Sequence, residues 1–210
     1  MRGSSLGLYS HAAAWVGDAV MLEGDADLFS HSTLNVAGIA ESAPNSPESR
    51  AVKVTLWAHS GMHVNGGIEV MQKLSVHENS DFTTDGALEV GTSDPSDPGL
   101  VLWHQATVAV GRLHVQNGVQ VFNDATLTCR GGATLEGSGA TAPWPSISYF
   151  SDSLQYGDLQ GDAPYPQTSV SLYVGAYGRV EVGARLRVSS GIAASPFSEI
   201  LASADLKSRQ

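Results

Sequence analysis

Short triplets of an apolar residue, any residue and a second apolar residue recur along this chain, and most of them end in valine. The middle residue usually carries a polar group, as in Asn35, His63 and Gln120. Successive side chains of an extended strand point to opposite faces, so the alternation buries one face and wets the other. The chain is therefore predicted to be a β-protein of many short strands. Thirteen triplets are present: Leu34–Val36, Val52–Val54, Met62–Val64, Ile68–Val70, Leu74–Val76, Leu88–Val90, Val108–Val110, Leu113–Val115, Val119–Val121, Leu127–Cys129, Leu172–Val174, Val180–Val182 and Leu186–Val188.

The composition is that of one folded domain. The 210 residues are 42% hydrophobic, which is enough for a core, and only 15% of them are charged. The 23 glycines fit stacked strands with tight corners better than a charged helical bundle. The net charge of −10 argues against a partner that is nucleic acid, because phosphate neutralisation needs a basic stripe. Arg179, Arg185 and Arg187 form a small basic cluster that is interpreted as a solvated face or a salt-bridge patch between subunits.

Membrane insertion is not expected, because the longest apolar runs are far too short for a span. Residues 1–20 lack a basic head followed by an apolar run and a cleavage site, so no signal peptide is evident. Cys129 fills the last apolar slot of its triplet and is interpreted as a buried hydrophobe.

Three polar or proline-rich stretches, 41–50, 92–99 and 138–168, are predicted to be loops. The third is rich in aromatic residues, which are over-represented at the centres of contacts between proteins. It is either a partner-binding surface or a flap that covers the core. Its candidate binding residues are Trp144, Tyr149, Phe150, Tyr156 and Tyr165.

Several triplets are spaced six residues apart, and acidic or glycine corners precede strands at 25–28, 85–88 and 124–127. Such loose self-similarity is typical of the stacked coils of a β-solenoid. Residues 125–137 (ATLTCRGGATLEG) and 178–188 (GRVEVGARLRV) resemble the parallel β-helices of viral tailspikes, viral capsid-surface knobs and bacterial adhesin passengers. The resemblance covers residues 60–190 and lies in the pattern of strand and corner alone. It implies an irregular, right-handed solenoid that associates side by side as a trimer.

An antiparallel β-sandwich or jelly roll is left open by the same residues. If Gln116–Gly118 is a hairpin loop, Val115 faces Val119 and the glycine takes the position that needs a left-handed backbone. The same six-residue step occurs at other places in the chain. If those steps were hairpins too, Lys73 and Arg185 would take the strained left-handed position, which favours the solenoid.

One short helix is predicted over 195–207, so the chain divides into a β-domain at 1–194 and a helical tail at 195–210. Ser195 can cap this helix and Pro196 suits its first turn. The apolar residues Phe197, Ile200, Leu201 and Ala204 fall on one helical stripe, and the first three are candidates for partner binding. The helix would cover the end of the solenoid or dock on a neighbouring subunit.

No set of residues indicates catalysis, a metal or a cofactor. The histidines lack the spacing of a metal site, and the acidic pairs Asp25/Asp27 and Asp94/Asp97 lie beside turn formers. No nucleophile elbow, phosphate loop or dinucleotide fingerprint occurs. We therefore expect no enzyme, no catalytic residue, no metal and no cofactor.

The expected function is that of a structural or interaction protein, which resemblance to viral β-helices would place on a virion or tail surface or decorating a capsid. Its expected partners are copies of itself and other structural proteins, and the expected location is a virion or an extracellular surface. The alternative is a carbohydrate-binding or polysaccharide-cleaving β-helix protein that holds a glycan against Trp57, Trp103 and Trp144. For Trp57 and Trp103, a place in the core is the favoured interpretation.

Overall fold

The computed structural model describes residues 2–37, 49–91, 97–137, 140–142 and 168–208. Within these ranges all regular structure is β-strand, which confirms the prediction of an all-β protein. Nineteen strands form one sheet in which every pairing is parallel, and two more form a small antiparallel pair. The described residues contain no helix that could span a membrane.

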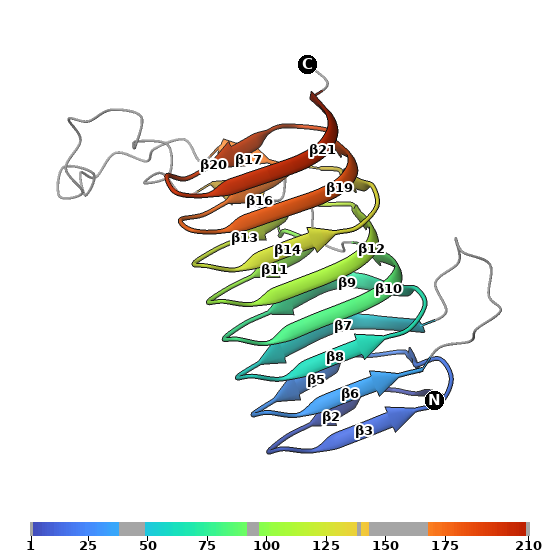
Figure 1. The fold of residues 1–210 in the computed structure, drawn as a ribbon. Helices are drawn as coiled ribbons and strands as arrows, with labels where there is room; N and C mark the ends of the chain where they lie inside the picture. The colour runs from blue at the N-terminus through green and yellow to red at the C-terminus, as the bar shows by residue number, and fades with distance from the viewer. Residues whose placement is uncertain (1, 38–48, 92–96, 138–139, 143–167, 209–210) are drawn as a thin grey trace.

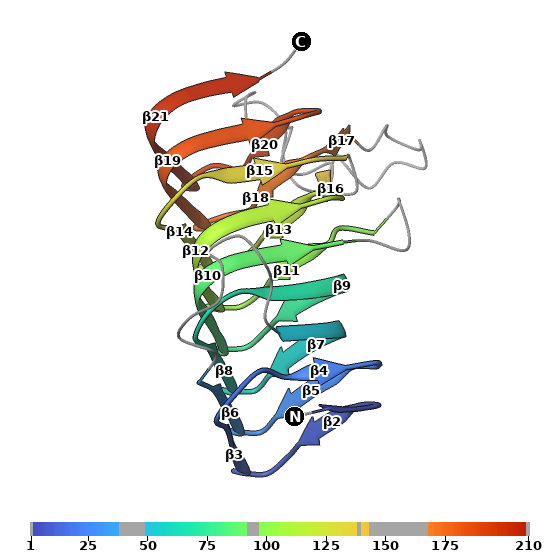
Figure 2. The ribbon, with the colours of Figure 1, turned by 90° about the vertical axis from the view of Figure 1, so that its right-hand side faces the viewer.

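The chain winds through three stacks of strands, A, B and C, and then begins the next coil above the first (Figures 1 and 2). The strands of each stack pair in parallel with strands of the coils below and above. Several strands are long because they bend from one stack into the next. Stack A contains β2 (Leu6–Leu8), β5 (Ala26–Phe29), the second parts of β7 (Ser49–Trp57) and β9 (Ile68–Val76), β11 (Leu100–Leu102), β13 (Val119–Val121), β18 (Leu172–Val174) and β20 (Ile192–Ala194).

Stacks B and C are built in the same way. Stack B contains β3 (Ala13–Val16), β6 (Thr33–Val36), β8 (Gly61–Val64), the first parts of β10 (Asp81–Val90) and β12 (Thr107–Val115), β14 (Thr126–Cys129), and the first parts of β19 (Arg179–Val188) and β21 (Glu199–Ser208). Stack C contains β1 (Arg2–Gly3), β4 (Met21–Leu22), the first parts of β7 and β9, β15 (Ala133–Leu135), and the second parts of β10, β12, β19 and β21.

The shortest coils set a register of about twenty residues. Leu6 pairs with Ala26, Val54 with Leu74, and Leu172 with Ile192. Longer steps occur where a coil carries an insertion, and these insertions include the predicted loops. Residues 41–48, 92–96 and most of 138–168 lie outside the described residues. The described ends of the third loop pair as strands β16 (Ala140–Ala142) and β17 (Thr168–Val170). The first predicted loop also reached too far, because Ser49 and Arg50 begin β7.

Apolar side chains from all three stacks fill the interior. The inward residues are mostly valine and leucine and are almost fully buried, and Phe82 is the largest side chain among them. The pairs expected for an antiparallel hairpin at 116–118 are not formed: Val115 pairs with Val90 and Leu135, and Val119 pairs with Leu100 and Leu172. Most triplets therefore mark inward positions of a strand, whereas Val52–Val54 spans a bend where the register shifts between Ala51 and Lys53.

The predicted helix at 195–207 is wrong. Residues Ser195–Ser198 form a tight turn with Phe197 at a φ of 61°, and Glu199–Ala202 then pair in parallel with Arg179–Val182. Ile200 and Ala202 pack against the core, whereas Leu201 between them points outward. The run alternates with a period of two as well as fitting a helical stripe, and pairing with β19 supplies the backbone hydrogen bonds that select the strand. Residues 199–208 thus continue the sheet.

Glycines mark the bend between stacks B and C, where adjacent coils approach closely. A Cβ atom on Gly111 would lie 2.2 Å from the backbone oxygen of Asp85 and 2.6 Å from that of Gly86. A Cβ atom on Gly183 would lie 2.2 Å from the oxygen of Arg130. Gly132 differs, because its nearest neighbour would be the oxygen of Arg185 at an ordinary 3.4 Å. The close approach of the backbones therefore requires glycine at positions 111 and 183, whereas position 132 has room for a Cβ atom.

This difference predicts opposite effects for two identical substitutions. Gly111→Ala should lower the free energy of unfolding by about 1–3 kcal/mol, because backbone atoms of two coils must move apart. Gly132→Ala should leave it unchanged or raise it by up to about 1 kcal/mol, because the unfolded chain loses freedom without new strain. Urea unfolding of both variants measures the difference, and equal losses would contradict the account of the bend.

Candidate interaction surfaces

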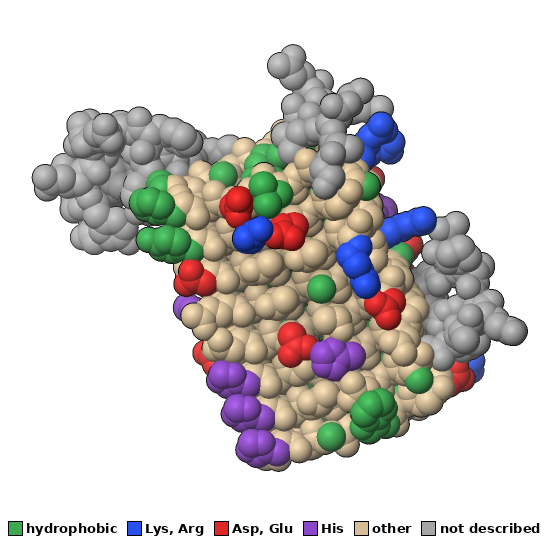
Figure 3. Space-filling view, viewed as in Figure 1, with side chains coloured by type: hydrophobic (Ala, Val, Ile, Leu, Met, Phe, Trp, Pro, Cys, Tyr) green, Lys and Arg blue, Asp and Glu red, His purple; other side chains and the backbone are tan. Residues whose placement is uncertain are grey.

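A row of tight turns joins stack A to stack B in every coil, and we call these turns the turn ridge. Figure 3 shows histidine and hydrophobic side chains gathered along the left edge of the molecule, where the turns lie. The ridge comprises residues 9–12, 29–32, 57–60, 77–80, 103–106, 122–125, 175–178 and 195–198.

The backbone of the ridge explains which residues it carries. In six of the turns both central residues have φ between 47° and 64°, as Ser30 and His31 do. Among residues other than glycine, histidine, asparagine and aspartate tolerate this left-handed conformation best. The second central residues of the six turns are His11, His31, His59, Asn79, Gln105 and Asp124. His104 is the first central residue of its turn, so turn geometry is a sufficient reason for four of the seven histidines.

Equivalent side chains of the ridge stack on one another from coil to coil. The rings of His11 and His31 lie 4.9 Å apart and those of His31 and His59 lie 4.8 Å apart, with interplanar angles of 4° and 1°. Parallel rings direct their nitrogen atoms alike instead of toward a common point. In the described part of the chain no group of three or more metal-binding side chains is suited to hold an ion.

An aromatic ladder runs beside these histidines on the outer side of stack A. Its members are Tyr9, Phe29, Trp57, His77, Trp103 and Phe122. Ring centroids are 4.4 Å apart for Trp57 and His77 and 4.0 Å apart for Trp103 and Phe122. The favoured core interpretation of the two tryptophans is wrong, because both rings lie outside and Trp57 is 38% exposed. The alternation predicts this direction, since Trp57 directly follows the inward residue Leu56.

Of the partner-binding residues predicted from the sequence, the structure describes Phe197, Ile200 and Leu201, and it does not bring these three together. Trp144, Tyr149, Phe150, Tyr156 and Tyr165 lie outside the described residues. Phe197 lies on the turn ridge, 78% exposed and stacked on Tyr177 at 5.4 Å. Ile200 packs against the core and Leu201 is exposed on stack B, so these three do not share a face.

The closest arrangement to a catalytic one lies on the flat outer face of stack B. His63 Nδ1 is 2.7 Å from Thr83 Oγ1, and its Nε2 is 3.3 Å from Asp81 Oδ2. Partial burial raises the pKa of Asp81, and the nearby His63 opposes that change. The neighbouring backbone N–H groups are engaged in the parallel ladder, so none is directed at a developing oxyanion. We interpret this group as a polar ladder between adjacent coils.

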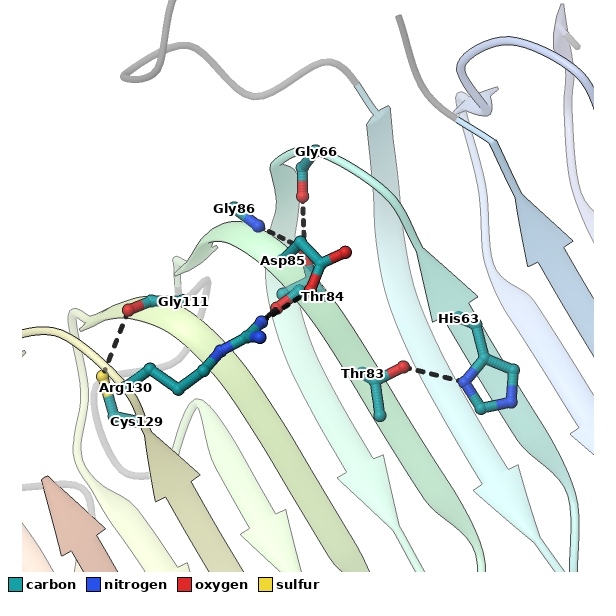
Figure 4. A network of polar contacts seen from close by, with 9 residues as sticks. All are labelled: His63, Gly66, Thr83, Thr84, Asp85, Gly86, Gly111, Cys129 and Arg130. Carbon is teal, nitrogen blue, oxygen red and sulfur yellow. Dashed lines mark hydrogen bonds and ion pairs between the residues drawn. The ribbon is translucent and has the colours of Figure 1, made fainter. Parts of the chain in front are cut away.

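Polar contacts also tie coils together at the bend between stacks B and C (Figure 4). Arg130 reaches past the intervening coil to donate to Asp85 Oδ1 at 2.7 Å and to the Thr84 carbonyl at 3.2 Å. The Thr84 hydroxyl in turn donates to the Gly66 carbonyl. Cys129 is buried beside this network, and burial raises the pKa of its thiol, which keeps it protonated.

The basic cluster predicted from the sequence is divided between two faces. Arg179 belongs to stack B, where it pairs with Glu181 at 2.5 Å and Glu199 at 3.3 Å. Arg185 and Arg187 follow the bend into stack C, where they join Arg112 around a hollow of about 320 Å³. Arg112 was not recognised from the sequence, because a separation of more than seventy residues hides a contact between stacked coils.

The acidic pairs show no catalytic geometry either. Asp27 lies on β5, and the backbone oxygen of Asp25 accepts a hydrogen bond from the Leu6 N–H at 2.9 Å. Asp97 binds Lys73 Nζ at 2.7 Å, and Asp94 lies outside the described residues.

Comparison with family models, with curated proteins and with solved structures gave no match to this chain.

The ridge predicts a pH dependence of stability. Partial burial lowers the pKa of His77 below its usual 6.5, with Lys73 and His104 acting in the same direction and Glu78 opposing them. The unfolded chain therefore takes up this proton at a higher pH than the folded protein does. Stability due to neutral His77 is complete above about pH 6.5 and is lost as the pH falls below it. His77→Phe keeps a ring against Trp57, so it should lose less stability than the wild type between pH 7.5 and pH 5.

Urea unfolding at a series of pH values measures this difference. The two proteins are compared first at pH 7.5, where His77 is neutral in both states, and this offset is subtracted at each lower pH. If the free energies of unfolding of the two proteins changed in parallel with pH, His77 would not contribute to the pH dependence of stability.

Proposed function

We propose that this protein is a non-enzymatic structural β-solenoid that associates with copies of itself. The solenoid is supported by the three parallel stacks, by the register of about twenty residues, and by an apolar interior that is continuous from coil to coil. In such a fold each coil packs mainly on its neighbours, which gives a rigid rod with regularly spaced side chains. A rod of this kind suits a scaffold.

The observation that carries the self-association is the exposure of aromatic rings at both ends of the turn ridge. Tyr9 and Trp57 on the ridge are exposed, and so are Tyr177 and Phe197 toward the C-terminal end. Large exposed apolar side chains that lie together mark contact surfaces. Tyr9 and Trp57 lie two coils apart near the N-terminal end of the ridge, and Tyr177 and Phe197 lie on adjacent coils with their rings 5.4 Å apart. A second copy carries the same rings and can pack against them at the two ends of the ridge.

A non-enzymatic role is supported by the placement of the polar groups. Those of stack B, such as His63, Asp81 and Thr83, lie on a flat surface and bind one another. Catalytic groups usually converge in a concave pocket that excludes water.

We propose a particle surface, such as a virion, a tail or a decorated capsid, as the location, with other structural proteins as further partners. The support for this location is the resemblance of residues 125–137 and 178–188 to viral β-helices, which also makes a trimer the first assembly to test. Side-by-side packing through the turn ridge leaves stacks B and C free for other partners.

The self-association predicts that the wild-type protein sediments as an oligomer at micromolar concentration. Tyr177→Asn with Phe197→Asn should weaken assembly at least tenfold, because two exposed rings leave the ridge. Asparagine is chosen because both positions have positive φ, which it tolerates. Sedimentation equilibrium over a range of concentrations measures the association constant and the number of subunits.

A matched control removes two exposed apolar side chains elsewhere. Trp15 is 80% exposed and Leu201 is 44% exposed, and both lie on the outer face of stack B. Trp15→Ser with Leu201→Ser should leave the association constant within twofold of the wild type. A strictly monomeric wild-type protein, or equal weakening in both double variants, would overturn assembly through the ridge.

Glycan binding is the second candidate, because Trp57 lies outside the core and is partly exposed. Sugars stack on the open face of an aromatic ring, whereas one face of Trp57 is covered by His77 and one face of Trp103 by Phe122. We expect the wild-type protein and Trp57→Ala to give the same result on a glycan array. A signal that this variant loses would favour the carbohydrate-binding function.

A further inference from the structure

The hollow on stack C is the strongest concentration of positive charge with a defined shape. Its lining consists of Arg112, Gly132, Ala133, Thr134, Arg185 and Arg187. These residues come from three successive coils, contributed by β12, by β15 with the residue just before it, and by β19. We propose that this hollow binds a tetrahedral oxyanion, a phosphate or sulfate group.

The register of the sheet builds the hollow. Leu113 pairs with Ala133 and Ala133 with Leu186, so Gly132 lies between Arg112 and Arg185 on the outer face. Rungs are about 4.8 Å apart, so the backbones of the two arginines are separated by about 10 Å. The missing side chain at Gly132 leaves this space open. An oxyanion there accepts N–H···O bonds of about 2.8 Å from guanidinium groups on two sides.

The second ladder supplies the remaining contacts. Thr134 lies between His114 and Arg187 in the same three coils. Its hydroxyl can donate to an anion, and Arg187 adds a third guanidinium group at the rim. Two carboxylates belong to the same stack: Glu89 is the register partner of His114, and Glu136 lies 3.5 Å from His114 Nε2. Neither carboxylate forms an ion pair with Arg185 or Arg187 among the described residues.

Charge pairing sets Arg185 and Arg187 apart from three other arginines of the described residues. Arg50 pairs with Glu69, Arg130 with Asp85, and Arg179 with two glutamates. Among the described residues, Arg185 and Arg187 form no ion pair. In a chain with a net charge of −10, two neighbouring arginines without a carboxylate partner are available to an external anion.

The test is a titration of the intact protein with inorganic phosphate and, separately, with inorganic sulfate, at constant ionic strength set with sodium chloride. Backbone amide shifts of Gly132 and Thr134 in ¹H–¹⁵N NMR spectra report binding. We expect saturable shifts in the millimolar range with at least one of the two anions. A preference for either defines the ligand class, and shifts that chloride alone reproduces would overturn the site.

Three variants separate the site from general electrostatics. Arg185→Ala with Arg187→Ala should weaken binding at least tenfold. Arg50→Ala with Arg179→Ala removes the same charge elsewhere and should change the affinity by less than twofold. Gly132→Val fills the hollow while retaining all three arginines, and its Cβ atom would meet only the Arg185 carbonyl oxygen, at 3.4 Å. Wild-type affinity in either the first variant or the third, with a dispersed NMR spectrum, would overturn the proposal.

Discussion

Parallel hydrogen bonding between coils at a nearly constant register is the constraint on which the rest of the structure depends. Each strand of an inner coil shares its backbone groups with the coils below and above, so one shifted coil would break two ladders. The apolar triplets fix this register, because a slip by one residue would turn inward side chains such as Leu74 and Val76 toward water. Insertions are accommodated between strands, and the step from Val119 to Leu172 retains pairing across a long insertion.

The same register places equivalent positions above one another, so a local preference in one coil becomes a ladder. The left-handed turn positions favour histidine, and histidines in three successive coils consequently stack ring on ring. Buried serines of the ridge behave similarly: the Ser60 hydroxyl donates to the Leu28 carbonyl and accepts from the Trp57 N–H, joining two coils. In this fold the local backbone geometry of a turn therefore also determines which side chains contact one another between coils.

Alternation was enough to predict many of the strands and most of their inward side chains, because one inward face per strand is a local property. The same alternation predicts that the side chain of Trp57 points outward, although the size of tryptophan favoured a place in the core as the first interpretation. The helix at 195–207 failed because a short run with Ile200 and Ala202 fits both periods, and only pairing with β19 decides between them. The meeting of Arg112 with Arg185 could not be predicted, since it depends on where the insertion before β18 ends.

Glycine has two physical roles at the bend between stacks B and C, and the distinction bears on function. At Gly111 and Gly183 the backbone of a neighbouring coil occupies the space that a Cβ atom would need, so close packing accounts for the missing side chain. At Gly132 the space is free and φ is not in the left-handed region, so neither packing nor backbone strain accounts for glycine there. The physical consequence of glycine at this position is the hollow between two arginines. Close packing holds the coils around this hollow at a fixed spacing, so the distance between the arginine backbones is set before any anion arrives.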